Sequence, residues 1–206
     1  MSLLLDPKPG SLRFIATYGL VVVLALTELL IAWWAIHPNV PEEYRAYYID
    51  QTTTCMRQSV TGAYRMGTTI NFRSGGDDTR ELRPCGWEGP TGDGMHALGE
   101  TARLRFTTGT ITTPMLLTLQ MTAVDIDGMS DQRVAVSANG VPVGATTIPR
   151  AQSATVPFTI PAGLTAQTGL LDIVLDFPDA VRARPGDSNT RKRSIKLTEA
   201  TLTPES

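Results

Sequence analysis

Residues 132–148 read QRVAVSANGVPVGATTI, and this stretch decides the fold of the chain. Small and β-branched residues lie on both sides of Asn139-Gly140. Both of these residues tolerate the positive φ angles that a tight type I′ hairpin requires. Arg133–Ala138 and Val141–Ile148 are therefore predicted to be antiparallel strands joined by a two-residue turn.

Similar stretches lie on both sides of this hairpin, separated by turn residues at intervals of roughly 8–15 residues. The further predicted strands are Thr68–Phe72, Thr101–Thr107, Met115–Val124, Ala154–Ile160, Leu170–Phe177 and Ser194–Thr203. No amphipathic helix is predicted between them, so we expect an antiparallel β-sandwich rather than a parallel α/β sheet. Met115–Val124 is long enough to cross this sandwich centrally. Pro142, Pro157 and Pro161 are expected near strand ends or edges, where a missing N–H does little damage.

The N-terminal region contains one long apolar segment, Phe14–Ile36, which reads FIATYGLVVVLALTELLIAWWAI. At about 1.5 Å per residue a helix of this length spans about 34 Å, enough to cross a bilayer core of about 30 Å. Trp33 and Trp34 are typical of an interfacial aromatic belt, and Pro38 cannot continue the helix. A cleaved signal peptide would have a shorter apolar stretch that ends in small residues. We therefore predict a retained transmembrane helix.

The charges that flank this helix indicate its orientation. Lys8 and Arg13 precede it, whereas Glu42, Glu43 and Arg45 follow it. The larger number of basic residues on the first side favours a cytoplasmic N-terminus. We expect a single-pass protein of the bacterial inner membrane whose C-terminal domain is periplasmic.

Four segments follow from these predictions. Residues 1–13 form a cytoplasmic N-terminal arm, and residues 14–36 form the transmembrane helix. Residues 37–66 are expected to be a connector with one short helix around Glu42–Ile49. Residues 67–206 form the extracytoplasmic β-sandwich. The predicted fold class is mainly β, with one N-terminal transmembrane helix followed by an antiparallel β-sandwich.

An acidic residue, Glu28, lies within a turn of the middle of the predicted span. Placing an acid there costs at least about 2.5 kcal/mol, so such residues usually have a partner. Small residues would let another helix approach the face that carries Glu28. In a helical projection this face contains Thr17, Val21, Ala25, Glu28, Ala32 and Ala35, with the bulky Leu24 and Ile31 beside it. Glu28 either contacts a polar or basic group on a partner helix, or stays protonated or bonded to Thr27 in a lone helix.

The chain contains two cysteines, Cys55 and Cys85. Two cysteines cannot form a structural zinc site, and no histidine lies near either at ligand spacing. A disulfide is the expected state outside the cytoplasm, where it would stabilise the fold by roughly 3–4 kcal/mol. The alternative is a pair of free buried thiols.

The composition excludes several classes of function. The chain has 206 residues, with 18 basic and 20 acidic side chains and a formal net charge of −2. This near balance argues against a nucleic-acid partner. His37 lies at the predicted membrane boundary, and His96 is expected in a surface loop. Neither belongs to a catalytic or metal-binding pattern, so we predict no enzyme, catalytic residue or cofactor.

Several carboxylates could nevertheless carry chemistry. Glu88, Asp125 and Asp127 could supply the two carboxylates that a glycosidase needs. Asp93, Asp125 and Asp127 could hold calcium in oxygen-rich loops. The aspartates of Gly92-Asp93-Gly94 and Asp127-Gly128 are also ordinary turn residues, which explains them without catalysis or a metal.

Parts of the chain resemble a jelly-roll β-sandwich domain of bacterial envelope proteins, often appended to membrane glycosyltransferases and related polysaccharide enzymes. The resemblance covers about Cys85 to Thr203. It is carried by Cys85-Gly86-Trp87-Glu88, Ala102–Phe106, Gln132-Arg133-Val134, Asn139-Gly140, Leu171–Pro178 and Pro185-Gly186-Asp187-Ser188. That family tends to follow its late serine with an acidic residue and an arginine, whereas this chain has Ser188-Asn189-Thr190-Arg191. The resemblance implies that the antiparallel β-sandwich is jelly-roll-like, and it does not carry over the catalytic activity of the relatives or a shared ligand site.

Two functions agree with these features. The first is a non-enzymatic accessory or scaffold subunit that contacts integral membrane proteins through Glu28 and the sandwich and braces the periplasmic face of a complex. The second is a membrane-tethered carbohydrate-binding module for polysaccharide synthesis or export, with Trp87 stacked on a sugar and Glu88 binding hydroxyls. Trp87 could instead be a core residue packed against a Cys55–Cys85 bridge. The first function is preferred, because a tether needs no acid and only Trp87 is available after Tyr64 as a tryptophan or tyrosine platform.

Basic residues concentrate near the C-terminus and offer a further candidate surface. They are Arg182, Arg184, Arg191, Lys192, Arg193 and Lys196. This stretch could dock an acidic partner or lipid headgroups, or it could be a solvated loop.

Overall fold

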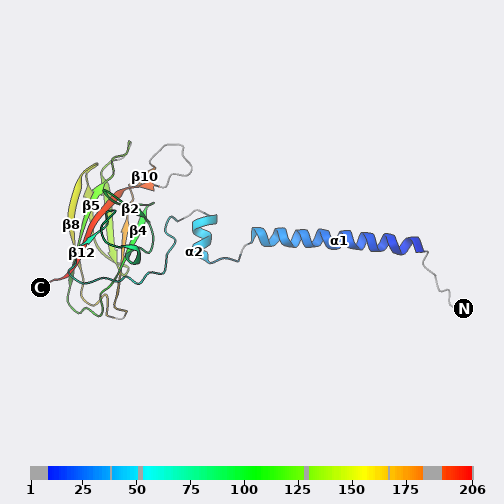
Figure 1. Cartoon of the computed structure of the whole chain (residues 1–206), viewed down its shortest axis with the longest axis horizontal. Helices are drawn as coiled ribbons and strands as arrows, with labels where there is room; N and C mark the ends of the chain where they lie inside the picture. Colours follow the sequence, from blue (N-terminus) through cyan, green and yellow to red (C-terminus); the bar gives the residue numbers. More distant parts are fainter. Residues whose placement is uncertain are drawn as a thin grey trace. The chain divides into compact units, whose positions relative to one another are not determined.

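The N-terminal part of the described chain is one continuous helix, α1 (Pro9–Ile36) (Figure 1). A computed structural model describes residues 9–37, 39–50, 53–127, 130–166, 168–182 and 192–205. The chain divides after Pro41 into two compact units, the second beginning at Glu42. Within α1, residues Phe14–Ile36 are long and apolar enough to cross a membrane, with a mean hydropathy of 2.2 and no burial inside the protein. By length and composition this segment is a candidate membrane span.

Polar side chains on α1 bond mainly within the helix. The Thr27 hydroxyl donates a hydrogen bond to the Val23 carbonyl, one turn earlier in the helix, at 2.8 Å. The ring of His37 stacks on Trp33 with centroids 4.8 Å apart. Within the residues that the structure describes, Glu28 is exposed and has no hydrogen-bond or ion-pair partner.

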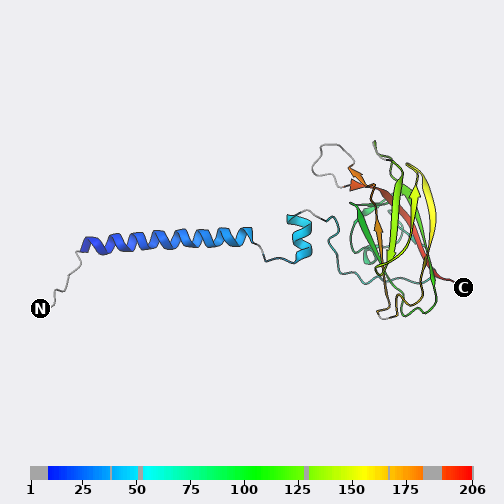
Figure 2. The ribbon, with the colours of Figure 1, turned by 180° about the vertical axis from the view of Figure 1, so that it is seen from behind.

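The second unit begins with a short helical segment and continues as a β-sandwich of two main sheets (Figure 2). The helical segment comprises α2 (Glu42–Tyr44) and the π-helical turn η1 (Arg45–Ile49), which confirms the short helix predicted there. One sheet has the order β2-β3-β12-β5-β8, and β1 also pairs with β12. Its strands are β1 (Ile70–Asn71), β2 (Trp87–Thr91), β3 (Gly94–Ala97), β5 (Met115–Ala123), β8 (Ser153–Ile160) and β12 (Ile195–Pro204).

The opposite sheet has the order β4-β9-β6-β7. Its strands are β4 (Thr101–Thr107), β6 (Gln132–Ala138), β7 (Val141–Ile148) and β9 (Leu170–Asp176). A short ribbon, β10 (Val181–Arg182) with β11 (Lys192–Arg193), and a 3-10 turn, η2 (Arg80–Leu82), complete the described elements. All pairs of named strands are antiparallel.

The connectivity of the sandwich is that of a jelly roll. From β3 to β9 the chain crosses between the sheets at every connection except the β6–β7 hairpin, and β12 returns beside β3. This alternation places eight of the strands, four in each sheet, in the arrangement produced by two Greek keys, and β1 and β2 extend the first sheet. The predicted antiparallel jelly-roll-like sandwich is confirmed.

The core lies between the two sheets and follows from alternation along the strands. Every second residue of β5, from Met115 to Ala123, is buried, and β4 and β9 alternate in the same way. One face of each strand therefore points inward, as its period of two requires. Leu104, Leu119 and Ile173 are fully buried in this core. β5 lies between β12 and β8, so its predicted central position is confirmed.

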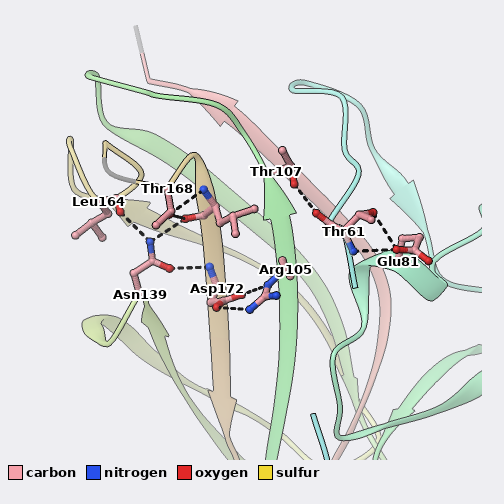
Figure 3. A network of polar contacts seen from close by, with 9 residues as sticks. Thr61, Glu81, Arg105, Thr107, Asn139, Leu164, Thr168 and Asp172 are labelled. Atoms are coloured by element: carbon pink, nitrogen blue, oxygen red, sulfur yellow. Dashed lines mark hydrogen bonds and ion pairs between the residues drawn. The ribbon is translucent and has the colours of Figure 1, made fainter. Parts of the chain in front are cut away.

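The hairpin predicted at Asn139-Gly140 forms as expected. Asn139 and Gly140 have φ angles of 47° and 82°, and Ala138 pairs with Val141 across the turn. The Asn139 amide donates to the carbonyls of Leu164 and Leu170 at 2.8 and 3.0 Å (Figure 3). The hairpin is thereby attached to the loop that precedes β9.

The segment that we expected to be a connector runs along the sandwich in its described part. Cys55 and Cys85 form a disulfide with Cα atoms 4.9 Å apart, which confirms the predicted pairing. The Glu81 carboxylate accepts hydrogen bonds from the backbone N–H and the hydroxyl of Thr61, both at 2.9 Å. The Thr107 hydroxyl donates to the Thr61 carbonyl (Figure 3). Residues 53–66 thus belong structurally to the second unit.

Candidate functional site

Among the residues that the structure describes, a cavity of about 460 Å³ beside the disulfide is a candidate ligand site. Small-molecule sites commonly have volumes of roughly 300–1,000 Å³ and combine apolar walls with a few polar groups. The aromatic and charged residues that line this cavity are Tyr47, Tyr48, Arg80, Arg83, Trp87 and Glu88. We refer to it as the aromatic cavity.

The wall at Cys85-Gly86-Trp87 is built by a close approach of two chain segments. Gly86 has a φ of +79°, and a Cβ atom there would lie 2.5 Å from the Cα of Ala102 in β4. Only glycine fits this position. The Arg103 N–H donates to the Cys85 carbonyl at 3.0 Å, which fixes the segment against β4.

Trp87 is partly buried and belongs both to the core and to the cavity wall. Its indole N–H donates to the Arg103 carbonyl at 2.7 Å, and its ring packs against the buried core residues. The ring also lines the aromatic cavity together with Cys85. The hydrogen bond satisfies the polar edge of the indole, so the ring has a fixed position in the wall.

Two tyrosines from η1 complete the aromatic lining. Tyr48 is 54% exposed, and its ring contacts Tyr47 edge-on with centroids 4.7 Å apart. The rings of Tyr44 and Tyr48 are tilted by 41°, with centroids 4.6 Å apart. Such pairs stabilise the ring orientations by about 0.5–1.5 kcal/mol beyond the area that they bury. The sequence analysis did not include Tyr47 and Tyr48 in the site, because they lie in the predicted connector.

The charged groups of the cavity have different partners. Arg80 forms two hydrogen bonds with the Asp78 carboxylate, at 3.0 and 2.7 Å, and these lower the pKa of Asp78 to about 2. The Glu88 carboxylate accepts a hydrogen bond of 3.0 Å from the Arg193 guanidinium. Arg83 is half-buried and donates to the carbonyls of Thr79 and Glu88 at 3.1 and 3.0 Å. Burial lowers the pKa of Arg83.

The structure places the other candidate residues away from a metal or catalytic arrangement. Asp125 and Asp127 both face Arg150, at 2.7 and 3.5 Å, and Asp93 pairs with Lys196. Within the described ranges, no three His, Cys, Asp or Glu side chains cluster as metal ligands would. Gly128 lies outside the described residues.

His96 corrects the prediction of a surface loop. It lies in β3, opposite Lys196 of β12, and is half-buried. Burial and the nearby Lys196 and Arg193 lower the pKa of His96. The glycines around it belong to a tight strand pair that sequence composition suggested was a loop.

Part of the C-terminal basic stretch is described. Lys192, Arg193 and Lys196 pair with Glu100, Glu88 and Asp93, respectively. Arg184 and Arg191, like the quoted Pro185–Ser188 motif and Lys8, lie outside the described residues.

The molecule thus comprises a jelly-roll β-sandwich preceded by an apolar helix. No family model matches the chain. No curated protein matches it. Among solved structures it is similar to a family GH115 4-O-methyl-α-glucuronidase, at 13% identity and a TM-score of 0.42, over 72% of this chain and 19% of that one.

Two carbohydrate-binding modules are also similar to the chain. A family 6 carbohydrate-binding module shares 12% identity with a TM-score of 0.38, over 71% of this chain and all of that one. The module CsCBM6-3 from Clostridium stercorarium, solved in complex with cellobiose, shares 14% identity with a TM-score of 0.38 over the same proportions. Identities and TM-scores this low do not assign a ligand or an activity to this chain.

Proposed function

We propose that the protein is a membrane-anchored, non-enzymatic carbohydrate-binding module whose binding site is the aromatic cavity. The observation that carries this proposal is the convergence of Tyr47, Tyr48 and Trp87 with the charged groups of Arg83 and Glu88 on one cavity. We propose further that α1 spans a bacterial inner membrane with its N-terminus in the cytoplasm, which places the domain in the periplasm. The Cys55–Cys85 disulfide supports an oxidising compartment.

Sugars have the two kinds of surface that such a cavity can bind. Their rings carry apolar C–H faces, which pack on aromatic rings, and their hydroxyls form hydrogen bonds. Tyr48 is exposed enough to contact a ligand, while the fixed Trp87 ring loses little entropy on binding. This arrangement changes the preference stated from the sequence, because the aromatic platform has three rings rather than one.

Glycan binding by the full chain in lipid nanodiscs tests the proposal. We expect an array of bacterial envelope polysaccharides to include ligands, and calorimetry to give at least tenfold weaker binding for Tyr48→Ala and Trp87→Ala. Tyr18→Ala is the matched control, because Tyr18 is an exposed tyrosine on α1, outside the cavity. Absence of binding to every polysaccharide, or equal binding by all three variants, would overturn the proposal.

A second candidate function is an accessory subunit of an inner-membrane complex. The observation that favours it is Glu28, an exposed acid in an apolar helix with no partner among the described residues. Thr17, Ala25, Ala32 and Ala35 share its predicted face. A partner helix that supplies a polar or basic group would offset the cost of this acid in lipid. The two functions can coexist, since they use different parts of the chain.

A further inference from the structure

The arginines around the aromatic cavity are not equally neutralised. Arg80 is held by Asp78 through two hydrogen bonds, and Arg193 is held by Glu88. Arg83 has only backbone carbonyls and the Met95 sulfur as hydrogen-bond partners among the described residues. Three guanidinium groups therefore share two carboxylates here, and the uncompensated charge lies on Arg83.

The geometry of Arg83 leaves part of its guanidinium available to a ligand. Its Nε and Nη1 atoms donate to protein atoms, whereas Nη2 has no partner within the described parts of the chain. Nη2 is accessible, unlike Arg193 Nη1, which is buried without a partner. Arg83 lines the cavity together with Trp87, Tyr47 and Tyr48.

A half-buried positive charge without a counter-ion is costly, and an anion that enters the cavity would reduce this cost. Burial lowers the pKa of Arg83, and the nearby Arg80 adds to this effect while Asp78 opposes it. Arginine prefers planar anions such as carboxylates, because its fork of N–H donors matches their two oxygens. Glu88 in the same wall would disfavour an anion on its side, but Arg193 offsets its charge.

We propose that the aromatic cavity selects acidic sugars, with Arg83 binding the carboxylate of a hexuronate residue while the aromatic rings contact its ring face. This inference rests on the proposed glycan-binding function and names the class of ligand. The hydroxyls of the same sugar remain available to Glu88 and to Gln58, which also lines the cavity.

A pair of ligands that differ only in charge tests this selectivity. Oligogalacturonate and its methyl ester have the same rings and linkages, and oligoglucuronate with its ester forms a second pair. With the full chain in nanodiscs, we expect calorimetry to show that the acid forms of at least one pair bind at least tenfold more tightly than the esters. The preference should shrink severalfold when salt rises from about 50 to 500 mM, because exposed parts of the ion pair are screened.

Variants of one arginine in the cavity and one outside it assign the effect. Arg83→Gln should bring the ratio of acid to ester affinity close to one while binding of the ester persists, and Arg83→Lys should retain part of the preference. Arg133→Gln is the matched control, because Arg133 is paired with Asp179 in the same way but does not line the cavity, and we expect it to keep the ratio. The wild-type ratio needs no variant, so the test stands even where Arg83→Gln fails to fold.

The outcomes separate the two proposals. Equal binding of acids and esters by the wild-type protein would overturn the selectivity for acidic sugars and leave glycan binding intact. An acid preference that survives Arg83→Gln in a folded variant would remove Arg83 from the assignment and overturn the inference. Failure to bind any glycan, charged or neutral, would overturn the proposed function and the inference together.

Discussion

Two hydrogen bonds join Asn139, which follows β6, to Asp172 in the neighbouring strand β9. The Asn139 backbone N–H donates to the Asp172 carbonyl at 2.8 Å, and the Asp172 N–H donates to Asn139 Oδ1 at 2.7 Å. The Asp172 carboxylate in turn binds Arg105 of β4 at 2.6 and 2.8 Å (Figure 3). A single turn residue thus connects the hairpin to two further strands of the same sheet.

This connection makes Asn139 a stability determinant. Asn139→Gly keeps the positive φ angle but removes the side-chain bonds, so we expect a loss of about 1–3 kcal/mol in the free energy of unfolding. Asn139→Ala should lose about 1 kcal/mol more, since alanine resists the left-handed region. Urea unfolding measures both. Wild-type stability of Asn139→Gly would show that the bonds contribute nothing net.

The disulfide should contribute measurably to stability. Cys55 and Cys85 are 30 residues apart, and the chain-entropy model assigns such a bridge about 3–4 kcal/mol. We expect a reductant to lower the urea midpoint of the wild-type protein to that of the Cys55→Ser/Cys85→Ser variant. The double variant itself should not respond to the reductant. A reduced protein as stable as the oxidised one would contradict this prediction.

Acid should weaken the sandwich through carboxylates whose pKa is low in the folded state. The Arg133 guanidinium and backbone N–H lower the pKa of Asp179 to about 2, and Lys196 and Thr91 do the same for Asp93. In the unfolded chain an aspartate titrates near 3.9. The stabilisation is therefore fully present above about pH 4 and is lost as the pH falls towards 2.

Removing one of these groups should flatten the acid side of the stability profile. We expect Asp179→Asn to lose less stability than the wild-type protein between pH 4 and pH 2, and Asp93→Asn/Asp179→Asn to lose less still. Urea midpoints at several pH values measure these slopes. Parallel profiles for all three proteins would show that other groups dominate acid unfolding.

The two roles of Trp87 can be separated by a conservative change. Trp87→Phe keeps a ring in the cavity wall but removes the bond from the indole N–H to the Arg103 carbonyl, which should cost about 0.5–1.5 kcal/mol of stability. Glycan affinity should fall less than in Trp87→Ala. Calorimetry on both variants provides the comparison, and equal loss of affinity in a folded Trp87→Phe would argue against a stacking role.

The accessory-subunit candidate predicts an effect confined to the membrane helix. Glu28→Leu should lower the recovery of co-purifying membrane proteins in mild detergent while membrane insertion is unchanged. Thr27→Leu is the matched control, because Thr27 already bonds to the Val23 carbonyl. Quantitative mass spectrometry measures the recovery. Wild-type stoichiometry for Glu28→Leu, or a monomer without partners, would contradict this function.

The strands with strong alternation were predictable from sequence. Thr101–Thr107 and Val141–Ile148 match β4 and β7, and Met115–Val124 exceeds β5 by one residue. In β4 and β5 every second residue is buried, so the side-chain period predicts these strands, whereas β7 is predicted by its β-branched residues and the turn at Asn139-Gly140. Pro142 and Pro157 lie on the edge strands β7 and β8, as expected from their missing N–H groups.

Strands defined by their partners were not predictable. β2 reads WEGPT and β3 reads GMHA, and neither has a β-rich composition. They form because β12 offers a pairing edge at Leu197, which is distant in sequence. Tyr47 and Tyr48 could not be predicted as site residues either, because the other residues that line the cavity are distant from them in sequence. No local pattern indicates that a segment before the disulfide lines a cavity with Trp87.

The position of β12 has a consequence for biosynthesis. This strand pairs with β1, β3 and β5, which precede it by about 75–130 residues, and it occupies the interior of its sheet. Contacts between such distant segments form slowly, because a long loop must close first. Until Ile195–Pro204 has been synthesised, β5, which contains Leu119, has no hydrogen-bonded neighbour on the side that β12 later occupies. A nascent chain stalled before this point would present unpaired strands to chaperones and proteases.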